Sequence, residues 1–142
     1  MGQSTWSGPV RAGTIKENAG ANLGNVVLSQ TGTYTQNSTT AVNVTFYLPP
    51  NSQILTFLID SLVAYNSAVS ATLTAGTAAA GTTYVSGVDM KASAGRLAPT
   101  YTAAQLTAMS NITTNTTVVV TITVSGATTA GNGRVTINYV QK

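Results

Sequence analysis

The sequence contains no histidine and no cysteine, and only three of its 142 residues are acidic. Zinc sites are built mainly from histidine and cysteine, and a nucleophilic serine normally needs a base such as histidine. We therefore expect no zinc site, no disulfide and no serine-hydrolase triad. The three carboxylates, Glu17, Asp60 and Asp89, are widely spaced along the chain. This composition predicts a protein that is not an enzyme and that has no catalytic residues, metal or cofactor.

Charge of either sign is also scarce. Charged residues make up 6% of the chain and give a formal net charge of +3. The six basic residues are Arg11, Lys16, Lys91, Arg96, Arg134 and Lys142. They form no run and no stripe with interleaved aromatic residues, so we expect no nucleic-acid partner. No apolar run approaches 18 residues, and we expect no membrane-spanning helix.

Threonine is the residue type that is abundant instead, at 26 positions, and hydrophobic residues make up 43% of the chain. Threonine, valine and isoleucine favour pleated, half-buried strands. A chain of this length corresponds to one domain. These features predict an all-β fold.

Alternation of apolar and polar residues locates the strands. It runs through residues 42–48, 118–124 and 135–140, the period of a strand with one buried face. Residues 54–65 are apolar on both faces in their first half, which indicates a central strand covered by the opposing sheet and by a partner or the N-terminal arm. The glycine-rich link after residue 124 predicts that the last two runs pair as a hairpin. We expect seven or eight strands in residues 25–142, forming one antiparallel β-sandwich of jelly-roll-like form.

One short helix is expected within this β domain. Thr102 and Gln105 have the spacing of a capping box, and the alanine-rich residues that follow Thr102 have good helix propensity. The helix should end near residues 109–111. The Ala- and Thr-rich residues 76–81 are predicted to connect the two strands of a hairpin.

Residues 1–24 differ from the rest of the chain, with five glycines, one proline and poor periodicity. We interpret them as an extended N-terminal arm that docks on a neighbour; a frayed terminus is the alternative. A lone tryptophan in such an arm favours docking, because tryptophan gains most when it is buried against a partner. The candidate partner contacts are Trp6, Arg11, Lys16 and Arg96. Ordinary solvated surface is the alternative for the charged ones.

The carboxylates of the main domain have structural interpretations. Asp60 interrupts an apolar strand and is expected at a sheet edge, a pore or a subunit contact. Asp89 is expected to form a surface ion pair with Lys91, two residues away. A calcium site at either carboxylate is formally possible, but no acidic calcium loop is present. The dispersed tyrosines leave a sugar-binding surface open as an alternative.

Several segments resemble small virion proteins of tailed bacteriophages, and among these the capsid decoration, or cement, proteins. The likeness covers most of the chain, although its motifs are not chemically specific. The segments are SGPVRAGTI at residues 7–15, NVVLSQT at 25–31, YLP at 47–49 and on through Ile54, YNSA at 65–68, ATL at 71–73 and TAAQLTAM at 102–109.

The resemblance implies a β-sandwich or jelly roll on the outer capsid surface of the virion, made in the host cytoplasm. It implies a homotrimer that bridges neighbouring subunits of the major capsid protein and stabilises the head. Two alternatives remain open at this point. One is another phage part, such as a head-fibre base, a tail or a tail-fibre domain. The other is a non-catalytic carbohydrate-binding module.

Overall fold

Eight strands and one helix make up the part of the chain that the computed structural model describes, residues 25–38 and 40–142. The elements are β1 (Val27–Thr35), β2 (Val42–Leu48), β3 (Ser52–Val63), β4 (Ser70–Gly76), β5 (Val85–Asp89), β6 (Gly95–Leu97), α1 (Ala103–Ser110), β7 (Thr116–Ser125) and β8 (Asn132–Gln141). The predicted N-terminal arm, residues 1–24, lies outside the described residues.

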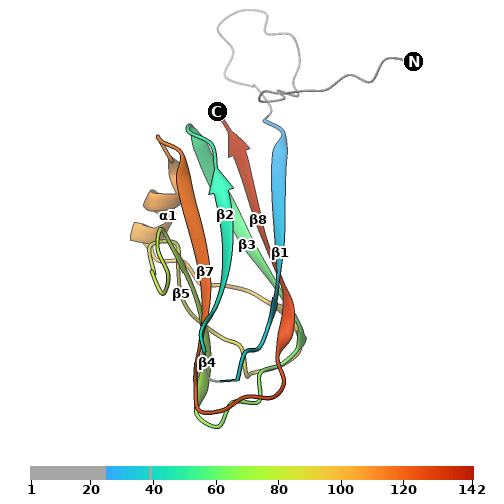
Figure 1. Ribbon diagram of the computed structural model, residues 1–142. Helices are drawn as coiled ribbons and strands as arrows, with labels where there is room; N and C mark the ends of the chain where they lie inside the picture. Colours follow the sequence, from blue (N-terminus) through green and yellow to red (C-terminus); the bar gives the residue numbers. More distant parts are fainter. Residues whose placement is uncertain (1–24, 39) are drawn as a thin grey trace, which may run out of the picture.

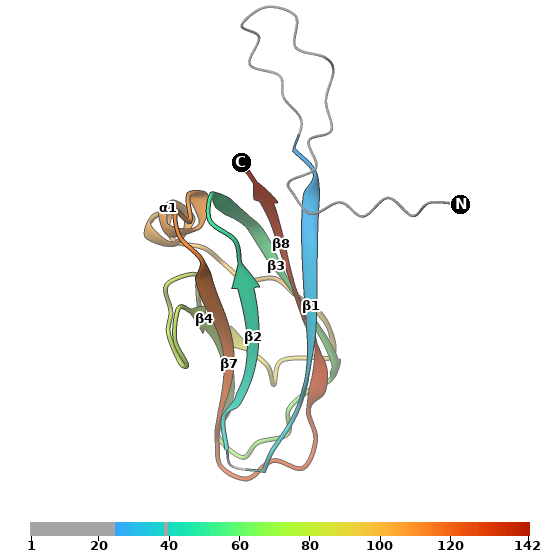
Figure 2. The ribbon, with the colours of Figure 1, turned by 45° about the horizontal axis from the view of Figure 1, so that its top comes forward.

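The strands form two four-stranded antiparallel sheets that pack face to face (Figure 1). Sheet A has the order β1-β8-β3-β6, and sheet B has the order β2-β7-β4-β5. The predicted antiparallel β-sandwich with one short helix is therefore confirmed. In Figure 2 the two layers are seen from another side, with α1 at the end of the sandwich where β7 begins.

The pairing is nested along the chain. β1 pairs with β8, β2 with β7, β3 with β6 and β4 with β5, all antiparallel. The innermost of these pairs is the predicted hairpin, and its connection includes residues 77–81. Two further pairings, of β3 with β8 and of β4 with β7, join the pairs into sheets. The chain is thus a long antiparallel ribbon that is wound into two layers.

The predicted hairpin of the last two strands is wrong, because β7 lies in sheet B and β8 in sheet A. β7 is flanked by β2 and β4, and β8 is flanked by β1 and β3, so neither strand has a free side for the other. Residues 126–131 instead cross between the layers, a separation of about 10 Å that a short loop spans easily. Alternation identified both strands but carried no information about their neighbours.

The core fills the space between the two inner faces. Strand β3 lies inside sheet A, as expected for a central strand, and it turns Ile54, Phe57 and Ile59 inward. The largest fully buried side chains of the described residues come from both sheets, from the residue just after β5 and from the helix end. They are Phe57, Leu48, Ile59, Leu73, Met90, Met109, Ile122, Ile137, Val85, Val118, Val120 and Val135.

Helix α1 closes one end of this core. Its N-terminus has the predicted capping box: the Thr102 hydroxyl accepts from the Gln105 N–H at 3.3 Å, and the Gln105 side chain accepts from the Thr102 N–H at 2.9 Å. The helix buries Met109, and the chain then pairs Ile112 with Ser52 at the start of β3. The short helix therefore covers the hydrophobic core at this end of the sandwich.

Candidate interaction surface

Three charged side chains meet on the outer face of sheet A. Asp60 on β3 stands opposite Arg134 on β8 and Arg96 on β6, so the three residues form one row across the strands. Its chain neighbours Ile59 and Ser61 are buried in the core, which directs Asp60 outward. The sequence had indicated an edge, pore or contact position for Asp60. The sheet-edge alternative is wrong, because β3 lies inside sheet A, and a pore or subunit contact at Asp60 stays a prediction.

The two arginines hold the carboxylate from opposite sides. Arg96 donates from Nε to Asp60 Oδ1 at 2.8 Å and from Nη2 to Oδ2 at 3.2 Å, and Arg134 donates from Nε to Oδ2 at 2.9 Å. The hydrogen bonds from Arg96 and then Arg134 lower the pKa of Asp60 to about 2. Asp60 is therefore ionised at neutral pH and positions both guanidinium groups.

This cluster is unequally exposed. The Asp60 side chain is 14% exposed, whereas those of Arg96 and Arg134 are 61% and 54% exposed. Two positive charges face one negative charge, so the cluster carries a net charge of about +1 at neutral pH. Among the described residues, Asp60 is the only carboxylate that forms an ion pair.

Apolar side chains border the charged cluster along β3. The pairing of β3 with β8 shifts between Ser61 and Val63, and at this irregularity Leu62 is 63% exposed. Val63 beside it is also exposed. A second irregularity, between Ile54 and Thr56, turns Leu55 outward. Bulges of this kind re-aim side chains, and here Leu55 and Leu62 are exposed at the two irregularities of β3.

Away from β3, the outer face of sheet A carries two uncharged hydrogen-bonded pairs across β1 and β8. Ser29 donates to Asn138 Oδ1 at 3.0 Å, and the hydroxyls of Thr31 and Thr136 lie 2.8 Å apart. These residues are direct partners across β1 and β8. The abundance of threonine thus produces ladders of side-chain hydrogen bonds on an open sheet face.

Sheet B is partly covered by the chain itself. The backbone N–H of Ala80, in the loop after β4, donates to Thr121 Oγ1 at 2.8 Å, and Thr121 donates to Asn43 Oδ1 at 2.8 Å. Thr121 is buried although it points away from the core. The loop that closes the β4–β5 hairpin therefore covers part of the outer face of sheet B.

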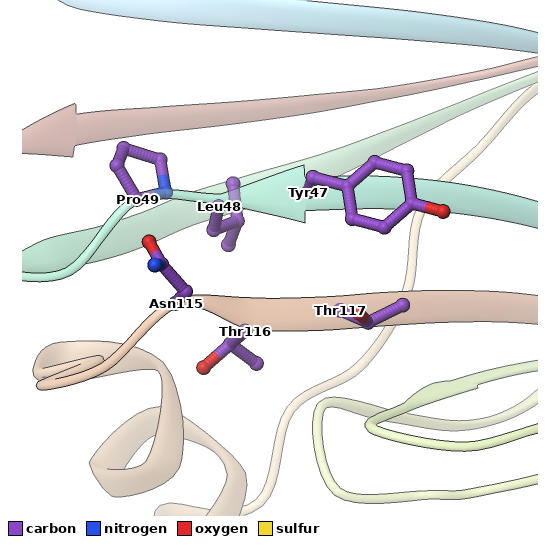
Figure 3. A pocket seen from close by; sticks show the side chains of 6 residues that line it. All are labelled: Tyr47, Leu48, Pro49, Asn115, Thr116 and Thr117. Atoms are coloured by element: carbon purple, nitrogen blue, oxygen red, sulfur yellow. The ribbon is translucent and has the colours of Figure 1, made fainter.

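A shallow hollow of about 370 Å³ lies where β2 ends and β7 begins. Figure 3 shows Pro49 and Asn115 toward one end of it and Tyr47 and Thr117 toward the other. The Tyr47 side chain is among the most exposed apolar groups, with Tyr47 70% exposed. An exposed ring beside amide and hydroxyl groups offers stacking and hydrogen bonding to a sugar, but the hollow has only one aromatic residue.

The positions predicted from sequence divide into two groups. Trp6, Arg11 and Lys16 lie outside the described residues, while Arg96 is in the charged cluster. Arg134 was not singled out from the sequence, although it occupies an outward position of a clearly alternating strand. Only the pairing of β8 with β3 brings it to Asp60.

The expected ion pair between Asp89 and Lys91 is not formed. Asp89 Oδ1 accepts from the backbone N–H of Lys91 at 2.8 Å, and Lys91 Nζ donates to the Val69 carbonyl at 3.1 Å. The short spacing favours a local turn in which the carboxylate caps the backbone rather than the ammonium group.

In residues 25–38 and 40–142, no three potential metal-ligating side chains gather in one place. Within the same residues, no helix is long and apolar enough to cross a membrane. No protein-family model, no curated protein and no solved structure matches this chain.

Proposed function

We propose that this chain is a structural virion protein that decorates the outer surface of a tailed-phage capsid. The observation that carries the proposal is the nested order of the eight strands, β1-β8-β3-β6 packed on β2-β7-β4-β5. Double-sheet jelly rolls of eight strands recur in viral capsid and lectin domains. We assign the sandwich to this jelly-roll type, in line with the resemblance to decoration proteins noted from the sequence.

The mechanism that we propose is mechanical. A protein that binds the assembled shell but not the free capsid subunits stabilises the shell by mass action. Bridging a seam between neighbouring subunits of the major capsid protein gives this selectivity, because the complete binding site exists only in the assembled lattice. A homotrimer matches the local three-fold symmetry of such a lattice, and many copies allow each contact to be modest.

The sandwich has surfaces that suit this role. It presents an open sheet face with apolar side chains at Leu55 and Leu62 and a charged cluster at Asp60. Interfaces combine such apolar anchors with arginine. The rest of that face is uncharged, which limits repulsion between closely packed copies.

The test combines oligomeric state with binding to shells. We expect light scattering to give three times the 14.4 kDa mass of one chain. The protein should co-sediment with undecorated shells of the virus that encodes it and raise the temperature at which they disrupt. A monomer that leaves shells unbound would overturn the proposal. Binding to tails or fibres alone would assign it to another part of the virion.

A carbohydrate-binding module is the second candidate, and the hollow at Tyr47 and Asn115 is the observation that favours it. Stacking of a sugar on the exposed Tyr47 ring predicts glycan binding that Tyr47→Ala abolishes. Glycan-array binding by the full chain that is lost in this variant, without any addition to shells, would select this candidate.

A further inference from the structure

We propose that Arg96 and Arg134 form a docking site for a carboxylate side chain of an acidic partner protein. The site lies on the outer face of sheet A, so this face is the one that meets the partner. The identification of that partner as a capsid subunit rests on the proposed function, whereas the chemistry of the site does not.

The first argument is the positioning of the two arginines. They approach Asp60 from the strands on either side of β3, and three hydrogen bonds of 2.8 to 3.2 Å hold them there. A long arginine side chain loses rotamer entropy when it binds a partner, and this cost is smaller when the side chain is already held. Asp60 therefore acts as a positioning residue for the two guanidinium groups.

The second argument is the number of donors that remain. Arg134 uses only Nε for Asp60, and within residues 25–38 and 40–142 its two terminal nitrogens have no hydrogen-bond partner. Arg96 uses Nε and Nη2, which leaves Nη1 without a partner in the same part of the chain. Two half-exposed guanidinium groups with unused donors suit a planar carboxylate, which accepts paired hydrogen bonds from arginine.

The third argument concerns charge. One carboxylate does not neutralise two arginines, and the surplus positive charge stands on a face whose other pairs are uncharged. An incoming carboxylate completes a balanced set of two positive and two negative groups. Charge complementarity of this kind gives specificity and register to an interface.

The surroundings of the cluster favour a protein over a nucleic acid. Leu62 and Val63 are exposed within three residues of Asp60, and protein interfaces combine arginine with such apolar anchors. A phosphate backbone needs a stripe of basic residues. The other two basic residues of the described part lie elsewhere and donate to carbonyls, Lys91 to Val69 and Lys142 to Ser110.

The first experiment measures binding of the full chain to a fluorescein-labelled oligo-glutamate by anisotropy, at low and at physiological salt. We expect Arg96→Gln and Arg134→Gln each to weaken binding about tenfold, the effect of losing one charge-assisted contact of about 1.4 kcal/mol. Arg134→Lys keeps the positive charge but loses the planar guanidinium group that can donate two parallel hydrogen bonds to a carboxylate. Its affinity should therefore lie between those of the wild type and Arg134→Gln.

Lys142→Gln is the matched control, because it removes one positive charge at the opposite end of β8. It should change affinity about twofold or less, as a screened distant charge does. Thermal melts establish that each variant is folded. Equal effects of Arg134→Gln and Lys142→Gln on the affinity for oligo-glutamate would overturn the site. So would binding of labelled single-stranded DNA through the same two arginines that is tighter than the binding of oligo-glutamate.

The second experiment repeats the comparison with undecorated shells. If the wild type adds to shells and the two arginine variants add much more weakly, both the docking face and the proposed function are supported. If all variants add equally, the docking face is wrong and the proposed function stands. If the wild type ignores shells but binds oligo-glutamate through Arg96 and Arg134, the site stands and the partner is another acidic protein.

Discussion

The side-chain amide of Gln30 on β1 pairs with both backbone groups of Tyr47 on β2. Gln30 Nε2 donates to the Tyr47 carbonyl at 2.8 Å, and Oε1 accepts from the Tyr47 N–H at 3.4 Å. β1 and β2 are edge strands of opposite sheets. The amide thus pairs with the backbone of one edge residue of β2 as a neighbouring strand would. It also links sheet A to sheet B through a side chain.

Replacing Gln30 by alanine should lower the free energy of unfolding by about 1 kcal/mol, because it removes hydrogen bonds that no other side chain replaces. Urea denaturation measures this change. Gln53→Ala is the control, since Gln53 makes no side-chain hydrogen bond within the described residues. Equal losses in the two variants would show that the contact with Tyr47 contributes nothing specific.

Acid should destabilise the fold through Asp60. Its pKa is lowered from 3.8 to about 2 by its two arginine partners, so the folded state binds this proton less readily than the unfolded chain. The stabilisation from Asp60 is complete above about pH 4 and is lost as pH falls toward 2. The thermal unfolding midpoint of the wild type should fall as pH is lowered over this range. The part of this fall that is due to Asp60 should be absent in Asp60→Asn. A decline unchanged in Asp60→Asn would contradict the assignment.

Gly133 is required where β1, β8 and β3 meet. A Cβ at this position would overlap the backbone oxygen of Asp60 and the hydroxyl of Tyr34, and it would lie 2.7 Å from Tyr34 Cζ. Gly133→Ala should therefore cost about 3 kcal/mol or prevent folding.

Gly95→Ala is the control that shows the cost of backbone strain without a packing clash, because Gly95 has a φ of +123° but no atom within 4 Å of an added Cβ. It should cost about 1 kcal/mol. Similar losses in the two variants would refute the packing argument.

Gln105 should matter more for stability than the capping threonine. Thr102→Ala removes one cap and should cost about 1 kcal/mol. Gln105 also donates from Nε2 to the Thr82 carbonyl at 3.1 Å and to Ser86 Oγ at 3.2 Å. Gln105→Ala should therefore cost about 2 kcal/mol, since it also detaches the helix from the segment around β5. Chemical denaturation of both variants measures the two losses in free energy of unfolding. A larger loss for Thr102→Ala than for Gln105→Ala would contradict the prediction.

Local features were predictable from the sequence where short-range physics decides them. The alternation in residues 42–48, 118–124 and 135–140 corresponds to β2, β7 and β8. The Thr102 capping box and the hairpin around residues 77–81 also form as expected, because each depends on groups a few residues apart. The local rule was misleading for Asp89, whose carboxylate caps the Lys91 backbone instead of pairing with its ammonium group.

Long-range partners were not predictable in the same way. Nothing local distinguishes Arg134 from any other outward residue of an alternating strand, and it meets Asp60 only because β8 inserts between β1 and β3. The same insertion separates β8 from β7, where the glycine-rich link suggested a hairpin. Alternation identifies the face of a strand but not its neighbours, since many sheet orders bury the same face equally well.

The sequence by itself determined the kind of protein this is: a β-sandwich with a short capped helix, few charges and no histidine or cysteine. Composition and periodicity suffice for that, because they set which backbone conformations bury apolar groups and which reactive groups exist at all. Only the tertiary structure decided where the scarce charges go. It joins Arg96, Asp60 and Arg134 across three strands, since contacts between residues far apart in sequence depend on the order of strands in the sheet.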